Sequence, residues 1–512
     1  MEIEIKKFND VWLDNGLSTF VKILESIKED DEDEEIIDEF IINSYEFHYR
    51  ISDKPEFIKS LSNAIESKIQ NLIVSVEDKK TGEKKEIKKD YILIQEKKKI
   101  GGKVALKEDI FDANKTEEII SSVYKNLDEG NKICFFCGRK FKSNIKKLQQ
   151  ASYPFVTKIK SLSGIRSGKE IKLTEYVSDI CPHCYLLGVL EWLDDSLIYR
   201  SIPTKKNIII LPQMNNIDEL IKLKKSYNGI LNNEKRWSNI KIDIDRNDVE
   251  NPPGKYSTLI SFYENLIRNI QPDKKANHWF IIEIPAGSVK NPKYFEIRFD
   301  ELILNLFYEL ILKQKCLFYR EFVKVFYAFY NDPKKGIRDF DREQILHEQL
   351  CQAITENNFN LFCNAFLPGK GVHIGIPKDA FDILEKIIKI WRIRKMNIEN
   401  KEDYLKTLQM ASQSIANLIG TRISLFFKLE KSKTPSGFLA ALQEITRRNI
   451  IDSESEIGKV YKSSIEKIAE LIIQKYDDKD GKQFFYDTKN IILIYASLRR
   501  KIESKKEEKT NE

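Results

Sequence analysis

Two short stretches hold four of the seven cysteines: Lys132–Cys137 reads KICFFC, and Asp179–Cys184 reads DICPHC. Each stretch contains a Cys-x-x-Cys pair, whose two-residue gap lets both thiolates reach one ion from a tight turn. Gly138 and Pro182 suit the turns that such pairs make. Four thiolates satisfy the tetrahedral geometry of zinc. The sequence therefore predicts a structural zinc site formed by Cys134, Cys137, Cys181 and Cys184.

The distance between the two pairs indicates where this site lies in the fold. Residues 138–180 form a longer gap than the roughly 15–20 residues of a compact zinc ribbon. We therefore expect the metal to close the base of a large inserted loop. Four cysteines leave no open coordination position, so we expect neither catalysis by the metal nor ligation by His183, which is expected near the site or exposed. An iron–sulfur cluster, a redox dithiol and unpaired core thiols are the alternatives.

The segment between the two cysteine pairs carries many basic residues and no acidic ones. From Lys132 to Lys169 it has ten lysines and arginines and no Asp or Glu, although the whole chain has 85 basic and 79 acidic residues. Lysine and arginine neutralise phosphates, and glutamine can contact base edges. The candidate nucleic-acid-binding residues are Arg139, Lys140, Lys142, Lys146, Lys147, Gln149, Gln150, Lys158, Lys160, Arg166 and Lys169. A second basic run, Lys97–Lys107, is a weaker candidate, and a solvated basic surface is the other interpretation.

The composition limits the class of protein. With 512 residues, 41% hydrophobic and 32% charged, the chain has the balance of a globular protein with about two to four domains. It has no apolar run of the roughly 18 residues that span a bilayer, and its start, MEIEIKKFND, lacks the pattern of a signal peptide. An odd, low cysteine count indicates a reducing compartment. We expect a cytoplasmic protein with no membrane contact.

Hydrophobic periodicity predicts an α+β fold. The front of the chain combines helix and strand patterns, and Pro368–Pro377, rich in Gly and Pro, is the expected boundary before a run of helical stripes. The predicted elements are a helix at Phe8–Ile27, strand at Ile36–Ile51, a hairpin of Asn71–Val76 with Asp90–Ile94, buried strands at Asn207–Met214 and His278–Pro285, and a long core helix within Asp300–Tyr330, broken at most once.

The resulting prediction is a mixed N-terminal domain with an inserted four-cysteine zinc region, followed by an all-α C-terminal helical bundle. Its parts are an α/β part at residues 1–130, the zinc-binding basic insertion at 131–192, the remainder of the mixed domain at 193–377, and the bundle at 378–512.

The sequence has no recognisable catalytic constellation. Gly164–Lys169, GIRSGK, is one residue short of a Walker A loop and lacks its Ser or Thr. Asp243, Asp245 and Asp248 are the residue type that binds divalent ions in nucleases, but this alternation is also typical of an edge strand. The five histidines have no paired spacing, and His48, between Phe and Tyr, is expected in the core or stacked. We therefore expect a binding or assembly role and no enzyme activity.

Three motifs together resemble one family. The chain opens with a Trp-Leu helix pattern at Val11–Leu17, carries CFFCG at Cys134–Gly138 and CPHCYLLGVL at Cys181–Leu190, and ends in helical stripes. This combination resembles the CRISPR-associated CXXC–CXXC proteins, large subunits of type I Cascade effector complexes, and is most similar to the type I-B branch. The detailed match is confined to Trp12–Gly16 and the two cysteine motifs, under a tenth of the chain.

The resemblance implies a non-catalytic subunit that acts in antiviral defence. Such a subunit contacts the 5′ handle of the CRISPR guide RNA and the protospacer-adjacent motif (PAM) of target double-stranded DNA, helps begin strand separation and recruits a helicase-nuclease. Its partners also include the backbone and handle-binding subunits of Cascade. Under this reading, the phosphate backbone is contacted by Lys140, Lys142, Lys146, Lys147 and Arg166. Gln149 or Gln150 then contacts a base or acts as a wedge.

The resemblance also bears on the C-terminal helices. In type I-B systems a small helical subunit can be made from an internal start in the large-subunit gene. A start at Met396 would give 117 residues and one at Met410 would give 103. The alternative is that Met396 is an ordinary residue at a helix end.

Two functions of other classes remain open from the residues alone. One is a divalent-metal-dependent nuclease that has a structural zinc site and uses Asp243 and Asp245. The other is a free-standing zinc-ribbon protein of transcription or translation, which would bind nucleic acid without a guide RNA.

Overall fold

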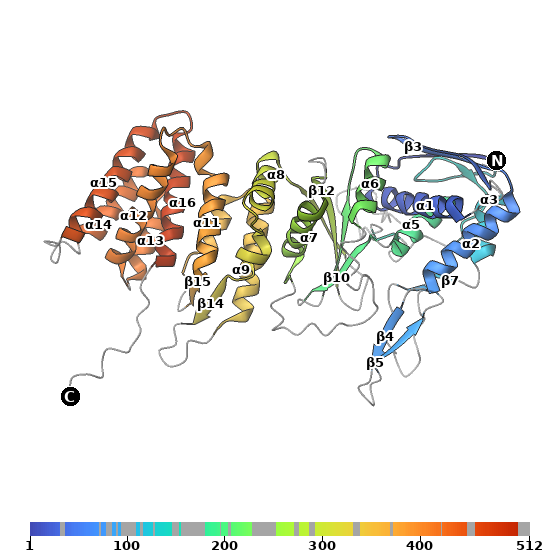
Figure 1. Cartoon of the computed structure of the whole chain (residues 1–512), viewed down its shortest axis with the longest axis horizontal. Coiled ribbons are helices and arrows are strands. Elements are labelled where there is room, and N and C mark those ends of the chain that lie inside the picture. The colour runs from blue at the N-terminus through green and yellow to red at the C-terminus, as the bar shows by residue number, and fades with distance from the viewer. Residues whose placement is uncertain are drawn as a thin grey trace, which may run out of the picture. The chain divides into compact units, whose positions relative to one another are not determined.

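The protein is described by a computed structural model (Figure 1). The chain divides into two compact units. Unit 1 comprises Met1–Arg246 and Asn269–Arg298, and unit 2 comprises Asn247–Arg268 and Phe299–Glu512. The four-part division expected from the sequence differs from this one, because the boundary between the units falls inside the expected part 193–377, and it stays a prediction. The described residues are 1–30, 36–70, 73–77, 84–88, 91–93, 109–112, 116–125, 129–145, 153–154, 180–194, 196–202, 206–227, 252–270, 276–285, 292–330, 338–368, 372–420, 422–447 and 456–499.

Helix α1 (Val11–Asp30), fully buried over its first half, organises unit 1. Asp10 caps its start, accepting hydrogen bonds from the backbone N–H groups of Trp12 at 3.0 Å and Leu13 at 2.9 Å. Residues 11–20 are all buried, as expected for a helix that is covered on every side. The predicted helix at Phe8–Ile27 is thus present with slightly shifted ends, because the cap lies after Phe8.

A three-stranded antiparallel sheet in the order β1-β3-β2 belongs to the same unit. The strands are β1 (Glu2–Lys6), β2 (Ile37–Ile42) and β3 (Glu46–Ile51), so the strand predicted at Ile36–Ile51 is a hairpin. Ile3 and Ile5 of β1 and Phe47 and Tyr49 of β3 are buried, while their neighbours in the strands are more exposed. This period of two lets one face of the sheet contribute to the core. Figure 1 shows β3 beside α1.

The hairpin predicted between Asn71–Val76 and Asp90–Ile94 is wrong in its pairing. Strand β4 (Ile73–Glu77) pairs with β5 (Lys84–Lys88), and β6 (Tyr91–Leu93) pairs with β7 (Asp109–Asp112). The sequence of β5, KKEIK, has a single apolar residue, so its strand character is invisible to a hydrophobic pattern. Helices α2 (Lys54–Gln70) and α3 (Thr116–Lys125) flank this region in sequence and contact each other.

A second antiparallel sheet of unit 1 has the order β10-β11-β12-β13. The apolar runs at Asn207–Met214 and His278–Pro285 form its two central strands, so this prediction is confirmed. Pairs such as Ile209 with Ile282 lie opposite each other and are fully buried. Helix α6 (Ile217–Tyr227) follows the second strand. The strands are β10 (Ile198–Ile202), β11 (Lys206–Pro212), β12 (His278–Pro285) and β13 (Lys293–Arg298).

The longer segment of unit 2, which starts at Phe299, begins with an interrupted helix. The long core helix predicted within Asp300–Tyr330, broken at most once, is present with one break, but its predicted extent is wrong because the last residues form a strand. It is α8 (Glu301–Tyr308), followed by the π-helical turns η4 (Glu309–Lys313) and η5 (Phe318–Val323) and then strand β14 (Tyr327–Tyr330). Lys315, with a φ of 55°, lies in the break between the two turns.

A buried carboxylate supports this break. Glu264, on α7 (Lys255–Ile270), accepts hydrogen bonds from the backbone N–H groups of Tyr319 at 2.7 Å and Arg320 at 3.2 Å, at the start of η5. Burial raises its pKa to about 8, although these two hydrogen bonds act in the opposite direction. The carboxylate therefore accepts from the N–H groups at the start of η5, which in a continuous helix would donate to the carbonyls of the preceding turn.

The stretch Pro368–Pro377 also contributes structure to unit 2. Its residues Val372–Gly375 form β15, which pairs antiparallel with β14. The remaining elements of this unit are helical, in agreement with helices in the C-terminal part. They are α9 (Phe340–Thr355), α10 (Phe359–Asn364), α11 (Lys378–Trp391), the 3-10 turn η6 (Ile393–Lys395), α12 (Lys401–Ile419), α13 (Ile423–Lys431), α14 (Pro435–Arg447), α15 (Glu456–Tyr476) and α16 (Gly481–Arg499).

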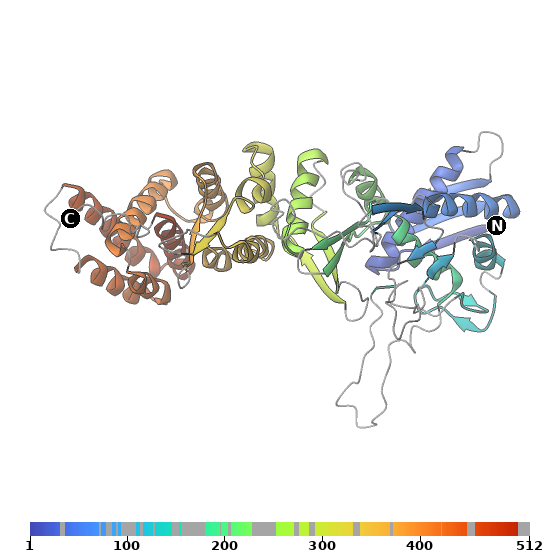
Figure 2. The ribbon, with the colours of Figure 1, turned by 90° about the horizontal axis from the view of Figure 1, so that it is seen from below.

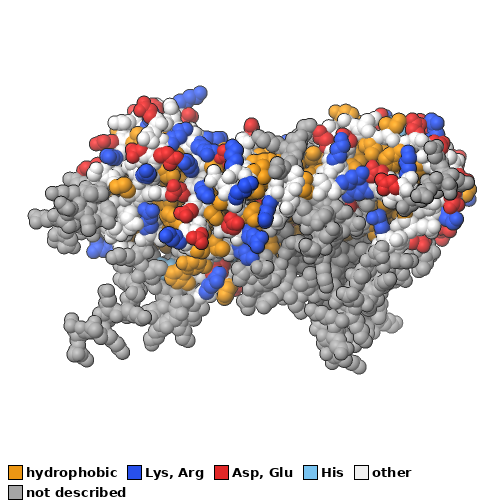
Figure 3. Space-filling model, viewed as in Figure 1, with side chains coloured by type: hydrophobic (Ala, Val, Ile, Leu, Met, Phe, Trp, Pro, Cys, Tyr) orange, Lys and Arg blue, Asp and Glu red, His pale blue; other side chains and the backbone are white. Residues whose placement is uncertain are grey.

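The last helices pack against one another. Helices α12, α15 and α16 are mutual neighbours, and Figures 1 and 2 show this bundle from two directions. On the face of unit 2 seen in Figure 3, acidic and basic side chains are interspersed and do not form a patch of one sign. No described helix is both long enough and apolar enough to cross a membrane.

Candidate metal centre and nucleic-acid interface

The first cysteine pair lies in the turn of a small hairpin in unit 1. Strand β8 (Lys132–Ile133) pairs with β9 (Lys140–Phe141), and Cys134 and Cys137 belong to the chain between them. The backbone N–H of Cys134 donates to the carbonyl of Arg139 at 2.8 Å, and that of Gly138 donates to the carbonyl of Cys134 at 2.9 Å. Gly138 has a φ of 71°, a left-handed conformation that glycine adopts without strain. The turn predicted at Gly138 is therefore present.

The second pair lies at the start of helix α5 (Pro182–Leu190). Cys181 is its N-cap residue, and its Sγ accepts a hydrogen bond from the N–H of Cys184 at 3.4 Å. Pro182 occupies the first turn, where its missing N–H costs nothing. The N–H of Cys181 donates to the Sγ of Cys134 at 3.3 Å, across the two pairs. A helix N-terminus and N–H donors both favour thiolate over thiol.

The four sulfurs form one cluster. All four Sγ atoms lie within 4.8 Å of one another, and those of Cys137 and Cys181 are 3.6 Å apart. Sulfurs bound to a tetrahedral ion at a Zn–S distance of about 2.3 Å lie about 3.8 Å apart, so the spacing suits such an ion. All seven cysteines are free thiols. The cluster is therefore compatible with a metal site, and its ligand set suits a soft cation.

The protein environment acts differently on individual thiols. Burial raises the pKa of the Cys184 thiol, and hydrogen bonds with the neighbouring thiols raise it further. Hydrogen bonds from Cys137, Cys181 and Cys184 lower the pKa of Cys134. Four sulfurs at such close range, three of them on buried residues, are an unfavourable arrangement without a cation to neutralise the thiolates.

His183 lies outside the ligand cluster and is buried beside it, so of its two expected placements, near the site or exposed, the structure shows the first. Its side chain is 3% exposed and lies edge-on to Phe20, with ring centroids 5.8 Å apart, and to Tyr124 at 6.5 Å. Burial, followed by the charge of Arg139, lowers its pKa to about 3, so the ring is neutral. His183 is part of the core that supports the cysteine helix.

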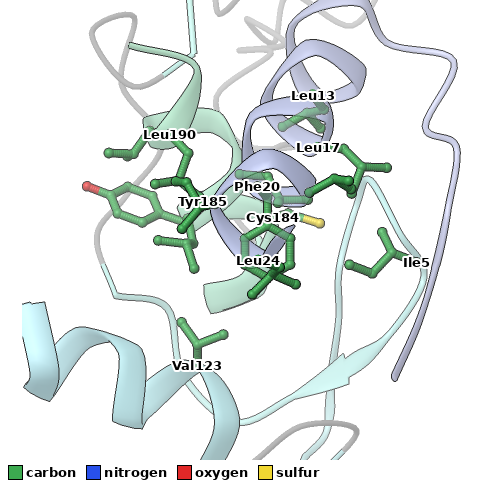
Figure 4. Close-up of a cluster of buried hydrophobic side chains, with 14 of the residues drawn as sticks. Ile5, Leu13, Leu17, Phe20, Leu24, Val123, Cys184, Tyr185 and Leu190 are labelled. Atoms are coloured by element: carbon green, nitrogen blue, oxygen red, sulfur yellow. The ribbon is translucent and has the colours of Figure 1, made fainter. Parts of the chain in front are cut away.

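Helix α5 is held against α1 at very short range. A Cβ at Gly16 would lie 2.1 Å from the carbonyl oxygen of Leu187, so glycine is required at this crossing. One turn earlier on α1, Trp12 donates its indole N–H to the carbonyl of Gly188 at 2.8 Å. Figure 4 shows Leu13, Leu17, Phe20 and Leu24 of α1 together with Cys184, Tyr185 and Leu190 of α5. The Trp12–Gly16 and Cys181–Leu190 motifs are thus packed together, although 164 residues lie between them in the sequence.

A buried ionic group at the other end of α5 was not predicted from the sequence. Lys224 of α6 forms ion pairs with Glu191 at 2.9 Å and with Asp194, and all three side chains are at most 1% exposed. Lys22 lies 3.2 Å from Asp194, and the hydroxyl of Thr19 donates to both carboxylates. The only signal in the sequence is the acidic EWLDD that follows the apolar helix, which by itself reads as a surface loop.

The carboxylates of this group differ in pKa. Burial raises the pKa of Glu191 to about 7. The pKa of Asp194 is lowered, because the charges of Lys224 and Lys22 outweigh the effect of its burial. This group, which we call the buried lysine cluster (Thr19, Lys22, Glu191, Asp194 and Lys224), links α1, α6 and the end of the cysteine-bearing helix.

The structure describes three of the candidate nucleic-acid-binding residues. Lys140 and Lys142 are exposed, at and just after β9. Arg139 is half-buried and donates a hydrogen bond to the backbone carbonyl of Glu4, so this guanidinium contacts the protein. The other eight candidates lie outside the described residues: Lys146, Lys147, Gln149, Gln150, Lys158, Lys160, Arg166 and Lys169. The runs Lys97–Lys107 and Gly164–Lys169 and the three aspartates Asp243, Asp245 and Asp248 lie outside them as well.

Exposed apolar side chains accompany the two lysines. Phe135, between the first two cysteines, is 55% exposed, and Ile133 is 62% exposed. Phe135 lies edge-on to Phe136 with ring centroids 5.3 Å apart. We call this region, made of Lys132, Ile133, Phe135, Lys140 and Lys142, the knuckle surface.

A second group of metal-binding side-chain types lies on the three-stranded sheet. Glu4, Glu46 and His48 have ligand atoms within 4.8 Å of one another, and all are half-buried. Glu4 pairs with Lys6 at 3.4 Å, and His48 lies 3.2 Å from Glu46. These are ordinary surface pairs, and the group gives no independent indication of a bound ion.

Comparisons with known proteins identify no relative of this chain, so the site is interpreted from its geometry. No family model matches the sequence, and no curated protein matches it. Fold and site together define a mixed α/β protein with helices in its C-terminal part and a four-cysteine cluster compatible with a metal site.

Proposed function

We propose that this protein is a zinc-stabilised, non-catalytic nucleic-acid-binding protein, the large subunit of a CRISPR RNA-guided type I Cascade complex. The observation that carries the nucleic-acid part is the knuckle surface, where exposed lysines and an exposed phenylalanine meet on a turn held by the four cysteines. The Cascade part rests on the resemblance carried by the Trp12–Gly16 and cysteine motifs.

The knuckle surface has the two components that a single nucleic-acid strand requires. Lys140 and Lys142 lie in or beside β9, and Lys132 lies opposite Phe141 in the paired strand β8. Lysines at such positions neutralise phosphates, and an exposed aromatic ring stacks on an unpaired base. The ring of Phe135 contacts that of Phe136 edge-on, and the ring centroid of Phe136 lies 5.1 Å from that of Tyr153. A supported ring loses little freedom when a base stacks on it.

The zinc ion is assigned to Cys134, Cys137, Cys181 and Cys184. When bound, it supplies a neutralising charge and a cross-link between the β8–β9 hairpin and α5, because its ligands come from both. With four protein ligands it has no open position, so its role is structural. Four cysteines also suit an iron–sulfur cluster, which metal analysis distinguishes.

In the proposed complex the protein contacts the 5′ handle of the guide RNA and the PAM of the target duplex, and it recruits the helicase-nuclease. Short motifs of this kind are read by few side chains, while the guide reads the rest by base pairing. The basic segment that continues from the knuckle surface, with Lys146, Lys147, Arg166 and Gln149 or Gln150, is proposed for this contact.

The C-terminal helices support one of the two internal starts. Met396 lies between η6 and α12, so a product that begins there contains all of α12 to α16. Met410 lies inside α12, so a start there would remove half of that helix. The proposed small helical subunit therefore begins at Met396. N-terminal sequencing of a short co-purifying band checks this assignment.

The assembly is tested by a mild, nuclease-free pull-down of the tagged chain from its native host. Short RNAs with a uniform 5′ end and repeat and spacer sequence, together with filament subunits, are the expected result. A chain recovered alone, or with heterogeneous RNA, would contradict the Cascade assignment and favour the free-standing zinc-ribbon protein. Divalent-ion-dependent cleavage that Asp243→Ala abolishes would favour the nuclease.

The knuckle surface makes a separate prediction about affinity. Phe135→Ala is expected to weaken binding of a forked DNA duplex about tenfold, because stacking contributes about 1–3 kcal/mol per base. The double variant Lys140→Gln, Lys142→Gln is expected to lower the slope of log affinity against log salt by about two, one for each lost phosphate contact. Fluorescence anisotropy over a salt series measures both effects.

Matched controls are available in the same unit. Tyr45, in the turn between β2 and β3, is 70% exposed, and Lys59 on α2 has a side chain that is 64% exposed. Neither residue belongs to the β8–β9 hairpin. Tyr45→Ala and Lys59→Gln are expected to leave affinity and salt dependence unchanged. If the knuckle variants bind like these controls, the knuckle surface is not the interface.

A further inference from the structure

A polar cavity lies within unit 2, away from the features used so far. It has a volume of about 590 Å³ and is lined by the segment between α9 and α10, by Arg392 after α11, and by side chains of α16. Sites for small ligands typically have volumes of roughly 300–1,000 Å³. The lining side chains that matter here are Arg392, Asp487, Tyr486, Gln483, Asn357 and Glu356.

Arg392 is held in place but lacks an ion-pair partner. Its guanidinium lies over the ring of Phe359, 4.8 Å from the centroid, and 5.0 Å from the ring centroid of Trp391. Its Nε is buried and has no hydrogen-bond partner among the described residues, and no carboxylate of the described chain comes within ion-pair distance. Burial lowers its pKa, while the charges of Asp487 and Asp300 oppose this. Arg392 as a whole is half-buried, but its buried Nε–H lacks an acceptor, which is costly unless something else in the cavity supplies one.

Asp487 provides the complementary group on the same cavity. It is 5% exposed and accepts one hydrogen bond, from the Nε2 of Gln483 at 2.9 Å. Burial raises its pKa, and the charge of Arg392 acts against this rise. The two charges therefore interact through space across the cavity without forming a direct ion pair. An occupant with acceptors for the guanidinium and donors for the carboxylate would satisfy both.

The surrounding residues hold this arrangement rigid and polar. Asn357, whose φ is 49°, accepts a hydrogen bond from the indole N–H of Trp391 at 2.8 Å, next to Arg392. Tyr486 is 39% exposed, and its hydroxyl donates to the carbonyl of Lys433 at 3.2 Å, which fixes the position of the ring. With Glu356 and Asp487 against Arg392, the charged lining is net negative, so the cavity does not favour a phosphate group.

We propose that this cavity binds a guanine base. Guanine presents two acceptors, O6 and N7, to an arginine fork, and its N2 amine donates to a carboxylate. Adenine offers N7 with an N6 donor in place of the second acceptor, so it satisfies Arg392 less well. Tyr486 supplies an aromatic ring for stacking. This inference is independent of the proposed function, because it uses other residues in the other unit.

Binding of nucleosides to the full-length chain tests the proposal. Isothermal titration with guanosine, which carries no phosphate, is expected to give saturable binding, and adenosine is expected to bind at least about tenfold more weakly. Asp487→Asn and Arg392→Gln are each expected to weaken guanosine binding at least about tenfold. The matched control is Asp478→Asn, on the turn before α16, where the carboxylate is 55% exposed and pairs with Lys475.

Folding and ligand source are separated by further measurements. If Asp487→Asn alters hydrogen exchange of α16, Tyr486→Leu decides instead, and it too is expected to weaken guanosine binding. If oligothymidine containing one guanine binds more tightly than guanosine, the cavity is assigned to an unpaired base of a nucleic-acid strand. If guanosine 5′-monophosphate binds as tightly as guanosine and the oligonucleotide does not bind more tightly, the cavity is assigned to a free nucleotide. Three results would overturn the proposal: no saturable guanosine binding, equal affinity for guanosine and adenosine, or cavity variants that bind guanosine as tightly as Asp478→Asn does. A peptide ligand would then be the class to test.

Discussion

Cys184→Ser is expected to abolish stoichiometric metal binding and to unfold the core of unit 1 around α1 and α5. Structural zinc contributes about 10–16 kcal/mol of apparent binding free energy in small zinc peptides, which exceeds the net stability of many domains. Cys184 is 2% exposed and belongs to the helix that packs against Trp12 and Gly16, so loss of the ligand also disturbs that contact. Elemental analysis of the purified chain measures the metal, and chemical denaturation measures the stability.

The control for this experiment is a cysteine outside the cluster. Cys316, 8% exposed in unit 2, donates from its Sγ to the carbonyl of Gln314, a bond that a serine hydroxyl can replace. Cys316→Ser is expected to retain full metal content and near-normal stability. Zinc in the wild-type protein supports the assignment, whereas iron with sulfide and a visible absorption band would replace it by an iron–sulfur cluster. Full metal content in Cys184→Ser would contradict the four-cysteine site.

Lys224→Met is expected to destabilise unit 1 by about 3–5 kcal/mol, because it leaves Glu191 and Asp194 buried without their shared cation. Lys22 stays within 3.2 Å of Asp194 and compensates only one carboxylate. Denaturant unfolding, followed by hydrogen exchange in peptides of α1 and α5, measures the loss. The neighbouring Lys225→Met, which removes a 48% exposed side chain paired with Glu25, is expected to cost less than about 1 kcal/mol.

The pH dependence of this variant has a definite sign. The folded pKa of Glu191, about 7, lies above its ordinary value of 4.5, so its contribution to stability is present below pH 4.5 and is lost as the pH rises through 7. Without Lys224 the penalty for ionising Glu191 increases. The stability deficit of Lys224→Met is therefore expected to be larger at pH 8 than at pH 5, and Glu191→Gln in the same background is expected to recover part of it. A deficit that does not change with pH would show that Lys224 acts through packing and not through charge.

Several parts of the fold were predictable because their signals are local. The helix at Val11–Asp30 and the buried strands β11 and β12 follow from apolar spacing. The cysteine cluster follows from two pairs with metal-ligand spacing, and the sulfurs indeed come within 4.8 Å. The run of helical stripes expected in the C-terminal part also appears as helices.

Features that depend on partners far along the chain were not predictable. The pairing of β4 with β5 rests on backbone hydrogen bonds of a mostly charged strand, and β14 with β15 joins segments about 45 residues apart. The break between η4 and η5 depends on the carboxylate of Glu264, which is more than 50 residues away from the η5 backbone that it accepts from. Arg139, interpreted from its charge as a phosphate contact, donates to the carbonyl of Glu4 in the structure.

The sequence alone thus specified those features whose residues are neighbours or have a fixed spacing, such as the metal-ligand spacing of the two Cys-x-x-Cys turns. Periodicity reports how a segment meets the core, but it does not report which distant segment covers it. For that reason the tertiary structure alone decided that Lys224 is buried between two carboxylates, that Gly16 lies against Leu187, and that Arg392 and Asp487 line one cavity. Burial of a charge is a property of the folded chain, because the same lysine or arginine in a linear pattern reads as a solvated surface.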